Sequence, residues 1–169
     1  EALKALAKDE PTRVILLIAK PPHPQVLRRI ARVLKTIRKP VITLFIGAPR
    51  KAGEPATLEE AALQAVALAQ GKKPDAVARQ LATRDEDMRK LARREAARRG
   101  KGRQYVRGLF SGGTFCAEAQ IILKSLPRGL YSNVPLQGVK QLKDSLVSQR
   151  HTLIDLGEDH QLCVIKADG

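Results

Sequence analysis

Residues 13–18 read RVILLI, a run of apolar and β-branched residues that suits a strand buried on both faces. Prolines interrupt residues 21–24 directly afterwards. An amphipathic pattern follows, with apolar residues three and four positions apart over 26–37. Residues 41–46 read VITLFI and predict a second strand, which ends at Gly47. The order strand, helix, strand is a βαβ unit, and it predicts parallel strands joined by a right-handed crossover.

The middle of the chain predicts two helices. Residues 57–60 read TLEE, which is the spacing of a capping box, and they open a helix that Gly71 closes. Pro74 favours the start of a second helix that continues to about Ala97. This second helix is rich in charge and poor in large apolar residues, so we expect it to be mostly exposed to solvent. We interpret residues 72–103 as a basic helical insertion in the domain.

The last third of the chain predicts a further strand, a helix and a final strand. Residues 105–110 fit a third strand, and the Gly-rich turn at 111–114 leads into a helix over 115–125. Residues 127–138 hold prolines and glycines and predict irregular structure. Residues 152–156 read TLIDL and fit the last strand. The complete pattern predicts an α/β fold with a parallel sheet.

The composition is that of a globular domain with an excess of basic residues. A chain of 169 residues suits a single domain over 1–169, and its hydrophobic share of 43% is ordinary for a folded protein. Aromatic residues make up 3%, so we expect a core built from Val, Ile, Leu and Ala. The net charge is +14, and the excess peaks over residues 72–103, where 12 Lys and Arg face 5 Asp and Glu.

Several classes of protein are disfavoured by the sequence. No apolar stretch approaches the roughly twenty residues that cross a membrane, and residues 1–4 do not begin a signal peptide. Because the chain starts at Glu1 rather than Met, we expect a fragment or a processed piece. Cys116 and Cys163 form neither a metal-ligand spacing nor a CxxC pair, which fits two lone thiols in a reducing, cytoplasmic compartment.

Three separated segments resemble one protein family, in the same order along the chain. The first is IAKPP at residues 18–22, followed after a helix by KPV at 39–41 and FIG at 45–47. The second is GLFSGGT at 108–114, followed by AEA at 117–119, and the third is HTLIDLGED at 151–159. On these segments the chain resembles the FdrA family. That family is similar to the second, flavodoxin-like domain of the succinyl-CoA synthetase (succinate–CoA ligase) alpha subunit.

The resemblance implies an open parallel flavodoxin-like sheet with helices on both faces. It also implies a CoA-binding nucleotide-type domain, either upstream or in a partner subunit of a hetero-oligomer. CoA or an acyl phosphate is then the implied cofactor, and a small anionic molecule is the implied substrate. Family members are linked to an oxamate carbamoyltransferase complex, so an acyl-CoA-ligase-like assembly and a carbamoyltransferase subunit both stay open. In either case we expect a non-autonomous subunit that is not active alone.

The chain departs from the succinyl-CoA synthetase pattern at the catalytic histidine. In the synthetase, the loop that matches residues 108–114 carries a histidine that becomes phosphorylated, and this chain has no histidine there. A glutamate that steadies that histidine is matched here by Lys20. Both departures argue against a phosphohistidine intermediate, and the FdrA family also lacks the histidine. Residues 161–169 do not match the family's Gly-Arg-Pro-His-Pro stretch, so we expect a truncated or altered C-terminal end.

The Gly-rich turn before the helix at 115–125 predicts an anion site. The first N–H groups of a helix lack intrahelical partners, and the helix dipole adds partial positive charge. Glycine lets the backbone approach an anion closely, and hydroxyl groups flank the two glycines. We expect a phosphate or carboxylate to bind, without covalent chemistry, at Lys20, Ser111, Gly112, Gly113 and Thr114. The alternative is a tight strand-to-helix turn with no ligand.

Three other sets of side chains are weaker candidates, and none is assigned a catalytic role. His151 and Asp155 alternate along the last predicted strand and share one face, which allows acid–base work, but we expect His151 to be an ordinary surface histidine. Residues 158–160 are of metal-ligand types, yet they lie where the chain departs from the family, so we predict no metal site. Glu118 is expected in the first turn of its helix, where a carboxylate favours the dipole.

The basic segment at 72–103 has a second interpretation as a nucleic-acid interface. Its arginines and lysines could neutralise phosphates. The acidic run at 85–87 breaks the basic face, however, and no aromatic residue is interleaved for base stacking. We therefore expect nucleic acid not to bind. The alternatives are a solvated helix and a non-catalytic module that docks on an acidic partner.

Overall fold

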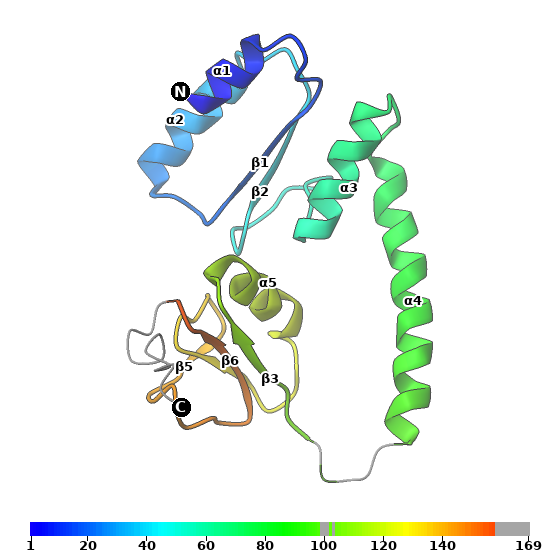
Figure 1. The fold of residues 1–169 in the computed structure, drawn as a ribbon, viewed down its shortest axis with the longest axis vertical. Coiled ribbons are helices and arrows are strands. Elements are labelled where there is room, and N and C mark those ends of the chain that lie inside the picture. Colours follow the sequence, from blue (N-terminus) through cyan, green and yellow to red (C-terminus); the bar gives the residue numbers. More distant parts are fainter. Residues whose placement is uncertain (99–101, 103, 158–169) are drawn as a thin grey trace, which may run out of the picture. The chain divides into compact units, whose positions relative to one another are not determined.

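The computed structural model describes residues 1–98, 102 and 104–157. The chain divides into two compact units, Glu1–Arg99 and Gly100–Gly169, which we call the N-terminal and C-terminal units. Both units combine helices with parallel strands (Figure 1). The predicted α/β class with parallel strands is therefore confirmed. The prediction of one domain over residues 1–169 stays a prediction.

The N-terminal unit opens with the βαβ unit that the sequence predicts. Helix α1 (Ala2–Lys8) precedes strand β1 (Ile15–Ala19), helix α2 (Pro24–Leu34) and strand β2 (Val41–Phe45). The two strands pair in parallel with Ile15 opposite Val41. Within this unit, α1 and α2 lie on one side of the strand pair and α3 lies on the other (Figure 1).

Helix α3 (Leu58–Ala69) starts with the capping contact that its sequence predicts. Thr57 Oγ1 accepts a hydrogen bond from the Glu60 backbone N–H at 3.1 Å. The Glu60 carboxylate accepts from the N–H of Ala56 at 2.7 Å, one residue earlier than the reciprocal contact of a capping box. At the other end, Gly71 has a φ of +73°, a left-handed conformation that favours glycine after a helix.

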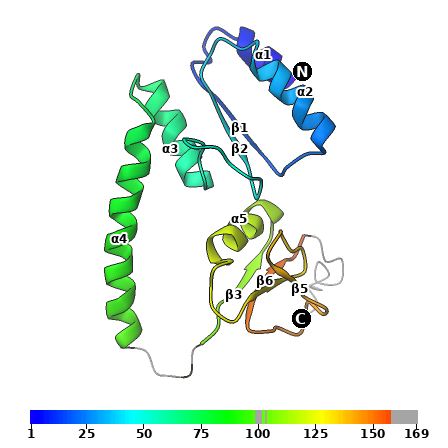
Figure 2. The same cartoon turned by 180° about the vertical axis from the view of Figure 1, so that it is seen from behind.

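Helix α4 (Asp75–Ala97) is long and mostly solvated. Among its 23 residues only Val77 is buried, which confirms the predicted exposure. The helix packs against α3, and the guanidinium of Arg84 binds the Glu59 carboxylate with both of its terminal nitrogens. Both views show α4 as one long, continuous helix (Figures 1 and 2). No helix in the described part of the chain is long and apolar enough to cross a membrane.

The C-terminal unit contains a parallel sheet with the strand order β3-β6-β4-β5. Its elements, in chain order, are β3 (Arg107–Phe110), α5 (Gly113–Leu123), β4 (Leu130–Ser132), β5 (Lys140–Gln141) and β6 (His151–Asp155). The last described strand, β6, is thus central, and all five of its residues are buried. The prediction of irregular structure was wrong at β4, a three-residue strand that holds its place by pairing with β6.

The core of the C-terminal unit lies between the sheet and α5. Cys116, Leu130 and Leu153 form its buried centre, and Phe110 and Leu123 pack against it. Gly108 is required by this packing, because a Cβ at that position would lie 2.8 Å from the Phe110 ring and 2.9 Å from Leu153 Cδ2. Helix α5 therefore covers one face of the sheet.

Candidate functional site

The turn between β3 and α5 forms the centre of the candidate site. Strand β3 ends at Phe110, and α5 begins at Gly113 with Gly112 as its N-cap residue. No side chain caps this helix in the described structure. The N–H groups of its first turn consequently have no intrahelical partner, and Ser111, Gly112 and Thr114 beside them are exposed.

The backbone at Gly112 does not need a glycine for steric reasons. Its φ of −155° is extended backbone that any residue adopts, and a Cβ placed there would meet no atom within 4 Å. A tight turn alone therefore does not account for glycine at this position. Absence of a side chain leaves the start of α5 open to a ligand that approaches the main chain.

An open hollow lies beside the turn, along the outer side of α5. It has a volume of about 410 Å³, and its lining includes Ser111, Gly112 and Glu118 together with apolar side chains. Three of those, Leu109, Phe115 and Ile122, are 69%, 66% and 58% exposed. Glu118 is not in the first turn of α5 as expected, because the helix begins two residues earlier than the sequence suggested.

Asp155 lies at the same edge of the sheet as the turn. It ends β6, and its register partner is Phe110, the last residue of β3. Its Oδ1 accepts a hydrogen bond from the N–H of Gly157 at 3.0 Å. Its Oδ2 is buried and has no hydrogen-bond partner within the described structure, although the residue as a whole is only 1% exposed. The predicted Asp155 thus contributes a buried, half-satisfied carboxyl group.

His151 lies at the opposite end of β6, four residues from Asp155 and so about 13 Å away. The expectation of a surface histidine was wrong, because His151 is 5% exposed. Its Nδ1 accepts from the N–H of Val106 at 3.1 Å, and its Nε2 donates to the carbonyl of Pro127 at 3.0 Å. Both ring nitrogens therefore tie the central strand to its neighbouring loops.

Lys20 follows β1 directly and is exposed. It belongs to the N-terminal unit, whereas Ser111, Gly112, Gly113 and Thr114 belong to the C-terminal unit. The participation of Lys20 in the site stays a prediction. Among the described residues no group of three His, Cys, Asp or Glu side chains could hold a metal ion. The candidate ligands at 158–160, Cys163 and the expected altered end lie outside the described residues.

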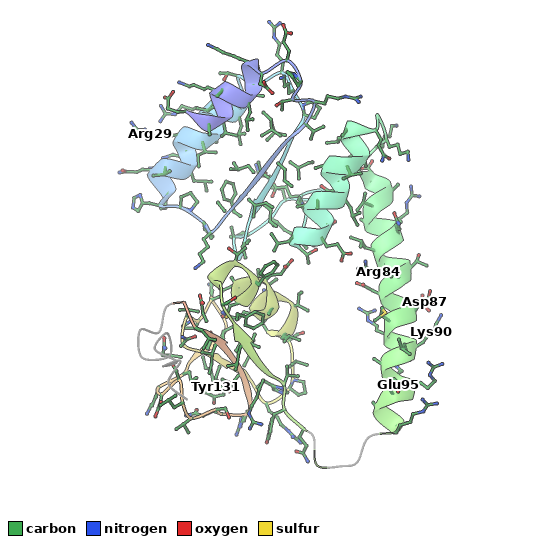
Figure 3. All side chains as sticks on the ribbon, in the orientation of Figure 1. Arg29, Arg84, Asp87, Lys90, Glu95 and Tyr131 are labelled. Atoms are coloured by element: carbon green, nitrogen blue, oxygen red, sulfur yellow. The ribbon has the colours of Figure 1, made fainter. Side chains whose placement is uncertain are left out.

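The basic segment contains surface ion pairs along α4. Lys90 binds Asp87 at 3.2 Å, and both residues lie on α4 (Figure 3). Lys90 also binds Glu86 at 3.5 Å, and Arg98 binds Glu95 at 3.3 Å. The hydrogen bond from Arg84 lowers the pKa of the Glu59 carboxyl group and raises the pKa of Arg84 itself. Much of the positive charge on this helix is thus paired with local carboxylates.

Comparison with known proteins gives one relative of interest. The chain is 33% identical over 165 residues, 94% of its length, to a protein of Escherichia coli strain K12 named "Uncharacterized protein YahF". No family model matches the chain, and no solved structure matches it. The match covers 31% of YahF, so the chain spans about a third of the length of that relative and is similar to that part of it.

Proposed function

We propose that this chain is a subunit or domain of an FdrA-type assembly, similar to the alpha subunit of succinate–CoA ligase. In it, the β3–α5 turn binds a phosphate or carboxylate group. The observation that carries the proposal is the uncapped start of α5, which follows a Gly-containing turn at the carboxyl edge of a parallel sheet. Ligands of open α/β sheets bind at this edge.

The physical basis of binding is the exposed start of α5. Its first N–H groups point away from the helix and carry the positive end of the helix dipole. The hydroxyl groups of Ser111 and Thr114 are exposed beside them and can donate further hydrogen bonds. The open space at Gly112 supports close approach of an anion to the backbone.

Binding proceeds without a phosphohistidine in this proposal. Of the two histidines in the described structure, His151 lies in the same unit as the turn. His23 belongs to the N-terminal unit, where its Nδ1 accepts from the N–H of Gln25 at the start of α2. His151 lies at the far end of β6 with both ring nitrogens hydrogen-bonded. A histidine without a free nitrogen is not a nucleophile.

The proposed assembly also contains a domain that binds the cofactor. A CoA-binding domain, upstream or in a partner subunit, would supply the rest of the active site, and CoA or an acyl phosphate would be bound there. Transfer of an acyl or a carbamoyl group fits an anion site of this kind, because both reactions handle small phosphorylated or carboxylated molecules. A cytoplasmic location goes with this function.

The test is phosphate binding by the purified chain and by two matched glycine variants. Gly112→Val places a branched side chain over the start of α5, in a backbone conformation that valine accepts. Gly102→Val is the control, since a Cβ there also meets no atom within 4 Å. Isothermal titration with inorganic phosphate should give about tenfold weaker binding for Gly112→Val and no change for Gly102→Val. Equal affinity in all three proteins would refute the proposed site.

A further inference from the structure

We propose that Asp155 makes the anion site selective for an oxyanion that carries its own O–H or N–H donor, as phosphate does and sulfate does not. The proposal rests on the anion site described above and names the chemistry of its ligand. Its starting point is the Asp155 Oδ2 atom, which is buried and has no hydrogen-bond partner within the described structure. Buried polar atoms are nearly always hydrogen-bonded, so an unpartnered carboxylate oxygen calls for a donor.

Strand alternation and register direct this carboxyl group toward the first turn of α5. Asp155 and Leu153 are two residues apart on β6 and so share one face of the sheet. Leu153 packs against Cys116, which lies in the first turn of α5, so that face is the one α5 covers. Asp155 is one step nearer the carboxyl edge than Leu153, and α5 begins at that edge. The Asp155 side chain therefore lies beneath the uncapped helix start.

Gly157 brings Asp155 and the turn into the same neighbourhood. A Cβ built on Gly157 would lie 3.3 Å from Asp155 Oδ1 and 3.7 Å from the carbonyl oxygen of Ser111, so both groups lie close to Gly157. In addition, Leu156 donates its N–H to the carbonyl of Phe110 at 2.8 Å, so the two chain segments stay paired past the strand ends. The carboxyl group of Asp155 and the turn at Ser111 thus both lie next to the backbone of Gly157.

The two sides of this region have opposite hydrogen-bonding character. The start of α5 offers N–H donors, and the carboxylate of Asp155 offers only lone pairs. An anion whose oxygens are all ionised can accept hydrogen bonds from the N–H groups of α5. It has no hydrogen to donate to Asp155, so its lone pairs would face the lone pairs of the carboxylate. Inorganic phosphate at neutral pH retains at least one P–O–H group, which can donate to Oδ2 while the other oxygens accept from the helix. Sulfate has no such proton.

Access to Oδ2 requires a local movement of the protein. The atom is buried, so a ligand oxygen reaches it only when the backbone around it moves. Once bound, the donor would fill the one hydrogen-bonding position that the described structure leaves open at Asp155. Discrimination by such a site is strong, because the wrong ligand leaves a buried group unpaired.

The experiment compares inorganic phosphate and sulfate by isothermal titration at pH 7 and equal ionic strength. We expect the wild-type chain to bind phosphate at least about tenfold more tightly than sulfate. Asp155→Asn should remove this preference, because the amide nitrogen donates to sulfate as readily as the amide oxygen accepts from phosphate. Circular dichroism confirms folding of the variant. The wild-type comparison needs no substitution, and equal affinities there would overturn the proposal even if the variant does not fold.

The outcomes separate the two proposals. Equal wild-type affinities for phosphate and sulfate would overturn the selectivity while leaving the anion site in place. An unchanged preference in folded Asp155→Asn would do the same, and Asp155 would then serve only to support the start of α5. Absence of binding by either anion would remove the proposed function and this inference with it. Preference for phosphate that Asp155→Asn abolishes supports both.

Discussion

The side-chain amide of Asn133 pairs with the backbone of Asp155 through two hydrogen bonds of 2.9 Å. Its Nδ2 donates to the Asp155 carbonyl, and its Oδ1 accepts from the Asp155 N–H. The last ladder pair between β4 and β6 joins Ser132 to Leu153. Asn133 therefore continues the ladder with a side chain after the main chain of β4 has turned away. This contact fixes the backbone from which the buried Asp155 carboxyl group projects.

Replacement of Asn133 by Ala should destabilise the protein measurably. It leaves the N–H and carbonyl of Asp155 without partners at a buried position, which costs about 1–3 kcal/mol in the free energy of unfolding. Urea denaturation would measure the loss. Gln149→Ala is the control, because Gln149 is exposed, and a surface change of this kind stays within about 0.5 kcal/mol. Similar losses of unfolding free energy in both variants would show that the hydrogen bonds between Asn133 and Asp155 contribute nothing to stability.

A second prediction concerns the packing of Gly108. A methyl group there meets the Phe110 ring and Leu153 Cδ2 at under 3 Å, so Gly108→Ala should overpack the core of the C-terminal unit. We expect a loss of about 1–3 kcal/mol in the free energy of unfolding, measured by urea denaturation. Gly102→Ala introduces the same methyl group where no atom lies within 4 Å and should change little. Unaltered stability in Gly108→Ala would mean that the ring and Leu153 move aside freely.

The third prediction is a pH effect at the contact between α3 and α4. The hydrogen bond from Arg84 lowers the pKa of Glu59 in the folded protein, so this contact stabilises the fold above the ordinary carboxyl pKa of 4.5. That contribution is lost as the pH falls and the folded carboxylate is protonated. Glu59→Gln should therefore lower the Tm at pH 7, and the difference from wild type should shrink toward about pH 3.

Glu86→Gln is the control for this pH effect. Glu86 pairs with Lys90 inside α4, with both side chains largely exposed, and surface pairs of this kind contribute little. The Tm of the Glu86→Gln variant should equal the wild-type Tm at pH 7 and at about pH 3. A Glu59→Gln difference that persists unchanged in acid would contradict the role assigned to the ion pair, and added salt should reduce the difference at pH 7.

Sequence patterns predicted most of the regular elements for physical reasons that are local. The apolar run at 13–18, the cap at Thr57 and the charged stretch ending at Ala97 each specify an element through neighbouring residues alone. Strand β4 escaped prediction because three residues carry no periodicity, and its place depends on pairing with β6, about twenty residues further along the chain.

Burial at the candidate site was the least predictable property. His151 was expected at the surface, as strand histidines commonly are. All five residues of β6 are buried instead, because the strand lies between β3 and β4 and α5 covers one face. The unpartnered Oδ2 of Asp155 follows from that position in the sheet, which no spacing along the sequence reveals.

The central position of β6 has a consequence for synthesis on the ribosome. Strands β3 and β4 each pair with β6 and not with one another, so neither has its inner neighbour until residues 151–155 have been made. During translation, one edge of β3 therefore stays unpaired while more than forty further residues are added. Such an edge can pair with other nascent chains. A ribosome pause that holds residues 151–155 inside the exit tunnel should increase aggregation, whereas a pause after these residues have emerged should not.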